Sequence, residues 1–136
     1  MQSERRKVMT TGFNTPLIAE FLRGDKSGRI SVYEPLLYHY HGANIIVPVG
    51  FWTDGASIPR ALWAVVGSPL KGAYRDAAVI HDYCYYSGVF TKGESDKIFL
   101  QGMEDLGVGY IRRQAMYRAV QIGGWYSWNN YRKNIS

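Results

Sequence analysis

The chain has 136 residues, of which 46% are hydrophobic and 20% are charged, a composition typical of a folded domain rather than of a disordered chain. This length supports one hydrophobic core and leaves too few residues for a comfortable second one, so we expect a single domain over residues 1–136. Its 16 lysines and arginines against 11 acidic residues give a net charge of +5, part of which lies near the two ends. Such a charge favours solubility over nucleic-acid binding.

Cys84 is the only cysteine, which excludes an intramolecular disulfide and argues against a disulfide-stapled secreted scaffold. No window approaches the roughly 18 to 20 uninterrupted apolar residues of a transmembrane helix. The first seven residues lead into no apolar run that resembles a signal peptide. We therefore expect a protein without a signal peptide or transmembrane segment that acts inside a cell.

Alternating hydrophobicity predicts strands in the first half of the chain. The predicted strands are 16–22, 29–40 and 43–49, and the glycine-containing stretch 24–28 suits a hairpin turn between the first two. A small antiparallel β-sheet is therefore expected in about residues 1–50. Residues 51–60 are interrupted by glycine and proline and are predicted to form a loop, in which Ser57 caps a short helix rather than acting as a nucleophile.

The second half of the chain predicts helices. Apolar residues recur every three to four positions over about 72–86, from 91 or 92 to 106, and from 110 to about 126. Together with the short helix after Ser57, these segments give three or four helices within about residues 59–128. Strands followed by helices define an α+β fold class.

Two of these helices carry a candidate site. His81 and Tyr85 are four residues apart and share one helix face, while Asp82 points about 100° away from His81. Asp96 lies early on the next helix, and the short connection predicts an antiparallel pair that brings Asp96 to His81. A carboxylate that accepts a hydrogen bond from one imidazole nitrogen raises the basicity of the other nitrogen, which is what a general base requires. Asp82, with Asp54 from the loop as a second ligand, is then available to bind a divalent cation.

The run HDYCY at residues 81–85, followed by Asp96 and Phe99, resembles the active-site helix pair of the phospholipase A2 superfamily. The resemblance covers about residues 77–103. It implies that His81 activates water, that Asp82 binds calcium, and that Tyr85 and Asp96 orient the histidine. It also suggests a lipid ester as the substrate.

A second resemblance extends over about residues 51–125. It rests on residues 53–60, the run AAVIHDY at 77–83, Asp96 with Phe99, and the run MYRAV at 116–120. Together these are similar to a small uncharacterised domain family of bacteriophages and prophages. This resemblance implies a phage or prophage origin, and hence a place in the host cytoplasm or the virion, but it brings no chemistry with it.

Two main hypotheses follow. In the first, the protein is a hydrolase with His81, Asp96 and Tyr85 as catalytic residues and with Ca2+, Zn2+ or Mn2+ held by Asp82 and Asp54. In the second, it is a virion or host-interaction protein in which the His-Asp helix pair is structural. Burial distinguishes them, because substrate must reach a catalytic pair. Nucleic-acid binding is a third hypothesis, which we rank below the other two.

Overall fold

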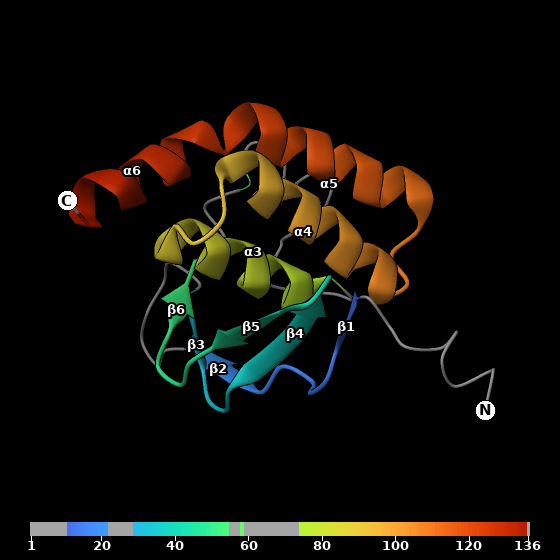
Figure 1. The fold of residues 1–136 in the computed structure, drawn as a ribbon, viewed down its shortest axis with the longest axis vertical. Helices are drawn as coiled ribbons and strands as arrows, with labels where there is room; N and C mark the ends of the chain where they lie inside the picture. The colour runs from blue at the N-terminus through green and yellow to red at the C-terminus, as the bar shows by residue number, and fades with distance from the viewer. Residues whose placement is uncertain (1–10, 22–28, 55–57, 59–73, 136) are drawn as a thin grey trace.

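The computed structural model describes residues 11–21, 29–54, 58 and 74–135 (Figure 1). The predicted turn at 24–28, the Ser57 cap and the short helix after it lie outside these residues. The described part of the chain has strands in its N-terminal half and four helices after them, which confirms the predicted α+β class. No helix among the described residues is long and apolar enough to cross a membrane.

The strands form two small antiparallel sheets of three strands each. The first has the order β1 (Thr11–Phe13), β4 (Leu36–Tyr40), β5 (Ala43–Val47). The second has the order β2 (Ala19–Phe21), β3 (Ile30–Val32), β6 (Trp52–Thr53). The first two predicted strands contain β2 and β3, which pair antiparallel with Ala19 opposite Val32.

The structure corrects two of the strand predictions. The single strand predicted over 29–40 is two strands, β3 and β4, which lie in different sheets and are separated by residues 33–35. Pro35 lies in this break, where its lack of an N–H removes no ladder hydrogen bond. The loop predicted over 51–60 contains β6, which pairs with β3 through only two residues and is too short for a periodic pattern to reveal.

The helices are α3 (Arg75–Ser87), α4 (Lys92–Asp105), α5 (Tyr110–Gly123) and α6 (Trp125–Ile135). Gly88 ends α3 in the left-handed conformation, with φ of 68°. Thr91 begins α4 with a capping box, because its hydroxyl accepts from the Glu94 backbone N–H while the Glu94 carboxylate accepts from the Thr91 N–H. These local signals explain why the predicted α3 and α4 agree closely with the structure.

The last predicted helix, from 110 to about 126, is in fact two helices that meet at Gly124. A Cβ atom at this position would overlap the Tyr85 hydroxyl and the Val120 carbonyl oxygen, so a side chain is not tolerated without a shift. Arg132 in α6 connects this helix to α3, because its guanidinium donates hydrogen bonds to the carbonyl oxygens of Tyr85 at 2.5 Å and Tyr86 at 3.0 Å.

The core lies on both sides of α3. Towards the sheets, Val79, Ile80 and Cys84 pack with strand residues such as Ile30 and Leu36. Towards the other helices, a second cluster joins α3 to α4 and α5; it contains Ala77, Ala78, Phe99, Met103, Met116 and Val120. Figure 1 shows the resulting layers, with the strands below α3 and with α4, α5 and α6 stacked above it. The helix that carries His81 is therefore the central element of the described fold.

Candidate active site

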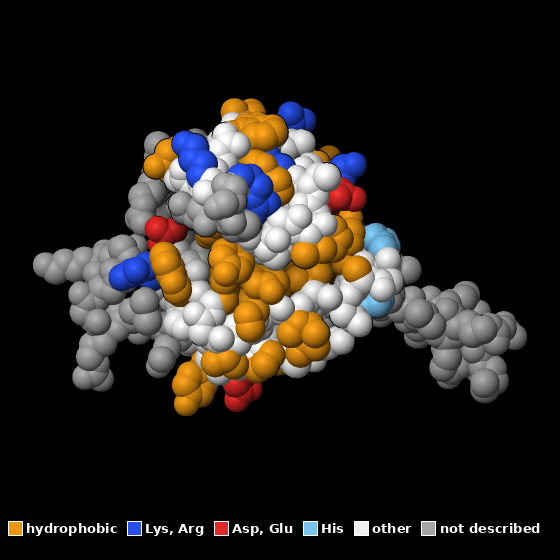
Figure 2. Space-filling model, turned by 60° about the vertical axis from the view of Figure 1, so that its left-hand side comes forward, with side chains coloured by type: hydrophobic (Ala, Val, Ile, Leu, Met, Phe, Trp, Pro, Cys, Tyr) orange, Lys and Arg blue, Asp and Glu red, His pale blue; other side chains and the backbone are white. Residues whose placement is uncertain are grey.

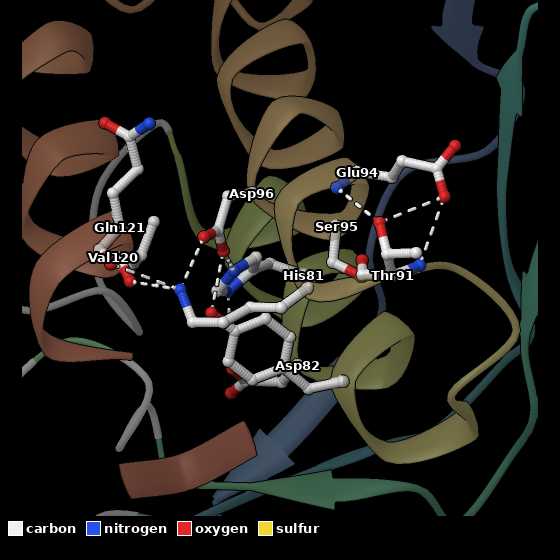
Figure 3. Close-up of polar contacts among 10 residues, drawn as sticks. His81, Asp82, Thr91, Glu94, Ser95, Asp96, Val120 and Gln121 are labelled. Carbon is white, nitrogen blue, oxygen red and sulfur yellow. Dashed lines mark hydrogen bonds and ion pairs between the residues drawn. The ribbon is translucent and has the colours of Figure 1, made fainter. Parts of the chain in front are cut away.

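His81 and Asp96 meet as the helix spacing predicts. The His81 Nε2 atom lies 2.7 Å from Asp96 Oδ1, and the Tyr85 hydroxyl donates to the same oxygen at 2.7 Å (Figure 3). The histidine and the tyrosine come from successive turns of α3, and the aspartate comes from the first turns of the neighbouring α4. The three predicted catalytic residues thus form one hydrogen-bonded group.

Lys92 binds the second carboxylate oxygen of Asp96. Its Nζ donates to Asp96 Oδ2 at 2.8 Å and to the carbonyl oxygens of Val120 at 3.0 Å and Gln121 at 3.3 Å, near the end of α5 (Figure 3). The ammonium also lies 4.7 Å from the centre of the Trp125 ring. This lysine was not predicted from the sequence, although its position four residues before Asp96 on one helix is a recognisable signal for an ion pair.

Asp82 lies on the other side of the imidazole. Its Oδ1 atom is 3.8 Å from His81 Nδ1, and its Oδ2 atom accepts a hydrogen bond from the Thr53 hydroxyl in β6. The imidazole of His81 is therefore placed between two carboxylates, one facing each ring nitrogen. Thr53 is the second residue of this group that was not predicted from the sequence, because it is 29 residues away from Asp82 and lies in a strand that was predicted to be a loop.

The whole group is buried. His81 and Tyr85 are 0% exposed, and Asp82 and Asp96 are each 2% exposed. The ring of His81 packs against Tyr85 at 4.3 Å and Phe99 at 4.8 Å between ring centres, which fixes its orientation. No buried side-chain nitrogen or oxygen among the described residues lacks a hydrogen-bond partner.

The charges in this group shift the pKa values of its members in opposite directions. Burial alone would lower the pKa of His81, but the hydrogen bonds and charges of Asp82 and Asp96 outweigh it and raise that pKa. Burial alone would raise the pKa of Asp96, but His81, Lys92 and Tyr85 outweigh it and lower that pKa. Burial and Asp96 raise the pKa of Tyr85, so this hydroxyl stays a donor. These opposite shifts favour a protonated imidazole beside an ionised Asp96 carboxylate.

The predicted cation ligands give a less complete site. Asp54 directly follows Thr53 and is partly buried; burial raises the pKa of Tyr131, and the charges of Asp82 and Asp54 raise it further. Within residues 11–21, 29–54, 58 and 74–135, no three histidine, cysteine or acidic side chains are grouped in a way that could hold a metal ion. One Asp82 oxygen already accepts from Thr53. The described donors do not surround a cation, so the divalent cation stays a prediction.

The fold and this group define an α+β protein with a buried His-Asp-Tyr-Lys centre on an antiparallel helix pair. Residues 30–120 match the family described as "Protein of unknown function (DUF1353)". The chain belongs to this family, and the match includes all six residues of the centre and its immediate partners: Thr53, His81, Asp82, Tyr85, Lys92 and Asp96.

Two curated relatives come from Sinorhizobium fredii (strain NBRC 101917 / NGR234). The uncharacterized protein y4jT is 42% identical over 78 residues, which are 57% of this chain and 23% of that protein. The uncharacterized protein y4iH is 39% identical over 72 residues, which are 53% of this chain and 30% of that protein. The matches thus span less than a third of the length of either relative. No solved structure matches this chain.

Proposed function

We propose that this protein is a hydrolase in which His81 is the general base and Asp96, with Tyr85 beside it, orients the imidazole. The observation that carries the proposal is the 2.7 Å contact of His81 Nε2 with an Asp96 oxygen that also accepts from Tyr85. This arrangement fixes the imidazole ring and its tautomer, so that Nδ1, which faces the Asp82 carboxylate at 3.8 Å, is the nitrogen that takes a proton from water. Lys92 keeps Asp96 ionised and hence able to stabilise the imidazolium that forms.

The same contacts set the expected pH dependence. Because both carboxylates raise the pKa of His81, the neutral imidazole that a base requires becomes abundant only above the ordinary histidine range. The rate of hydrolysis should therefore rise as the pH increases through neutrality. The imidazole is also closed to solvent, so turnover requires the side chains that cover Nδ1 to move aside.

The finer parts of the proposal rest on sequence resemblance. The likeness of residues 77–103 to the phospholipase A2 superfamily supports a lipid ester as substrate and a cation at Asp82 and Asp54. The likeness of residues 51–125 to a phage and prophage domain family supports a phage-associated role, in the host cytoplasm or the virion. Each part is tested separately from the general-base role of His81.

The test is turnover of phospholipid vesicles and of short-chain soluble esters by the purified full chain, with added calcium and with a chelator. His81→Gln and Asp96→Asn should each abolish hydrolysis, whereas His39→Gln, on the partly exposed face of β4, should leave it unchanged. Circular dichroism establishes that each variant is folded. Wild-type turnover in folded His81→Gln or Asp96→Asn would exclude the general-base mechanism. Metal analysis of the native protein and of Asp82→Asn tests whether a divalent cation is bound at Asp82.

A second candidate is favoured by the complete burial of His81. In this alternative the protein is a non-enzymatic virion or host-interaction protein. The centre then has only a structural role, which is to hold α3, α4, α5 and β6 together. It predicts that the wild-type protein hydrolyses none of the esters, with or without calcium, while His81→Gln loses stability. Partner binding would then use exposed aromatic residues such as Trp125 and Tyr126. A nucleic-acid partner would be recognised by an affinity that falls steeply with salt.

A further inference from the structure

A pocket of about 490 Å³ lies beside β6 and is walled mainly by aromatic rings. Five rings line it, those of Phe51, Trp52, Tyr83, Tyr86 and Tyr131, together with the turn at Pro48. In Figure 1, β6 and the end of α6 lie on the left, and Figure 2 turns this side towards the viewer. Hydrophobic side chains gather across the middle of this face. The volume is within the range of about 300 to 1,000 Å³ that is usual for small-molecule sites.

The rings of this aromatic pocket pack edge to face, so that they form walls of different orientation. Phe51 and Tyr83 lie 5.3 Å apart at 87°, and Tyr86 and Tyr131 lie 5.8 Å apart at 85°. Trp52 and Tyr86 are about half exposed, at 51% and 47%. Solvent therefore reaches the large ring surfaces at the rim, while the packing between rings keeps the pocket formed without a ligand.

The lining restricts the chemistry of the ligand. None of the described lining residues carries a charge, which argues against a phosphate or a metal ion. None is a long aliphatic side chain, which argues against an acyl chain. Among the described lining residues, the polar side-chain groups are the hydroxyls of three tyrosines and the indole N–H of Trp52. Burial raises the pKa of the Tyr131 hydroxyl, so it remains a hydrogen-bond donor.

We propose that the aromatic pocket binds a neutral pyranose sugar unit of a glycan. A pyranose has C–H groups on its faces and hydroxyls around its edge, which match ring faces for stacking and tyrosine hydroxyls for hydrogen bonding. Trp52 and Tyr86 provide exposed ring surfaces for stacking, and the Arg29 guanidinium lies over the Trp52 ring, 4.9 Å from its centre. The partly buried Tyr131 provides a hydroxyl donor. This binding is independent of the proposed hydrolysis, because the pocket contains none of the residues of the His81 centre.

The test is saturation-transfer NMR on the full chain with cellobiose, maltose, lactose, mannobiose and chitobiose at millimolar concentrations. At least one sugar should receive saturation at its ring C–H protons. Trp52→Ala should weaken its binding about tenfold or more, which corresponds to at least ~1.4 kcal/mol. Trp52→Phe should retain part of the affinity. Tyr126→Ala, which removes a 75% exposed ring outside the pocket, should leave the sugar-binding signal unchanged.

His81→Gln separates this inference from the proposed function, because sugar binding should persist in that variant whether or not the protein is a hydrolase. The inference is overturned if no sugar of the panel gives a signal, or if the signal is the same in wild type, Trp52→Ala and Tyr126→Ala. Binding of hexanoate that depends on Trp52, without binding of any sugar, would also overturn it and would identify an acyl site.

Discussion

The His81 centre and the aromatic pocket are close in the chain but opposite in character. Asp82 and Tyr83 are consecutive, yet the first lies in a closed polar group and the second lines an open pocket. In the centre, the buried polar side-chain atoms are paired and solvent is excluded. In the pocket, the rings of Trp52 and Tyr86 are about half exposed, with the Arg29 guanidinium over the Trp52 ring. The centre should therefore contribute strongly to stability, and the pocket should contribute mainly to recognition.

The largest effect should come from Asp96→Ala. This change leaves His81, Tyr85 and Lys92 without their shared acceptor and buries an uncompensated positive charge, which destabilises a fold by about 3–5 kcal/mol. Urea unfolding followed by circular dichroism measures the loss. Glu104→Gln is the matched control, because Glu104 is 56% exposed and its ion pair with Arg113 is long, at 3.9 Å. Equal stability of the two variants would contradict the structural importance of the centre.

Gly124→Ala should have the next largest effect. The added Cβ would overlap the Tyr85 hydroxyl and the Val120 carbonyl, so the helix or the tyrosine must shift, at a cost of about 1–3 kcal/mol. In Gly93→Ala the new Cβ would meet no atom within 4 Å, and stability should be unchanged or slightly higher. The comparison is made by thermal unfolding, and a similar melting temperature for both variants would show that Tyr85 adapts freely.

The pH dependence of stability should be smaller but characteristic. The pKa of His81 is raised in the folded state, so its stabilisation is complete below about pH 6.5 and is lost as the pH rises through the raised pKa. The pKa of Asp96 is lowered, so its stabilisation is present above about pH 4 and is lost as the pH falls through the lowered pKa.

Urea unfolding between about pH 6 and 9 measures the first of these effects. The free energy of unfolding of the wild type should decline over this range because His81 loses its proton. His81→Gln should lack most of that decline. Parallel curves for the two proteins would mean that His81 is already neutral in the folded state at pH 6.

The smallest effect on stability should come from Trp52→Ala in the aromatic pocket. Because Trp52 is 51% exposed, its removal should change the free energy of unfolding by only about 0.5 kcal/mol or less. Thermal unfolding and the sugar-binding signal are measured on the same sample. A loss of several kcal/mol would show that the pocket is part of the structural core and would remove the contrast between the two regions.

The sequence predicted the part of the site that local geometry determines. Helical spacing places Tyr85 beside His81, and the short α3–α4 connection brings Asp96 to them, so this group could be expected from the residue pattern alone. The partners that join distant segments could not be expected. Thr53 reaches Asp82 across 29 residues, from a strand of two residues that leaves no periodic pattern.

Helix packing was also harder to predict than helix formation. Ile111 and Ile122 fit a helical apolar pattern, yet they are 83% and 80% exposed, because α5 buries a different side of itself against α4. The break between α5 and α6 falls at the glycine pair 123–124, where the Tyr85 hydroxyl and the Val120 carbonyl leave no room for a Cβ on Gly124. The aromatic pocket combines three segments, around residues 51, 83 and 131, and so has no continuous sequence signature.

Lys92 has a consequence for the motion that hydrolysis would require. Lys92 and Asp96 both lie on α4, so the bonds from this ammonium to the Val120 and Gln121 carbonyls join α5 to α4, and an opening that separates Asp96 from His81 would move α5 together with α4. The backbone amides near Asp96 and near Val120 should therefore exchange with deuterium at a common rate, as one cooperative unit. A protein built in this way would expose its histidine rarely and all at once, in openings that α5 shares.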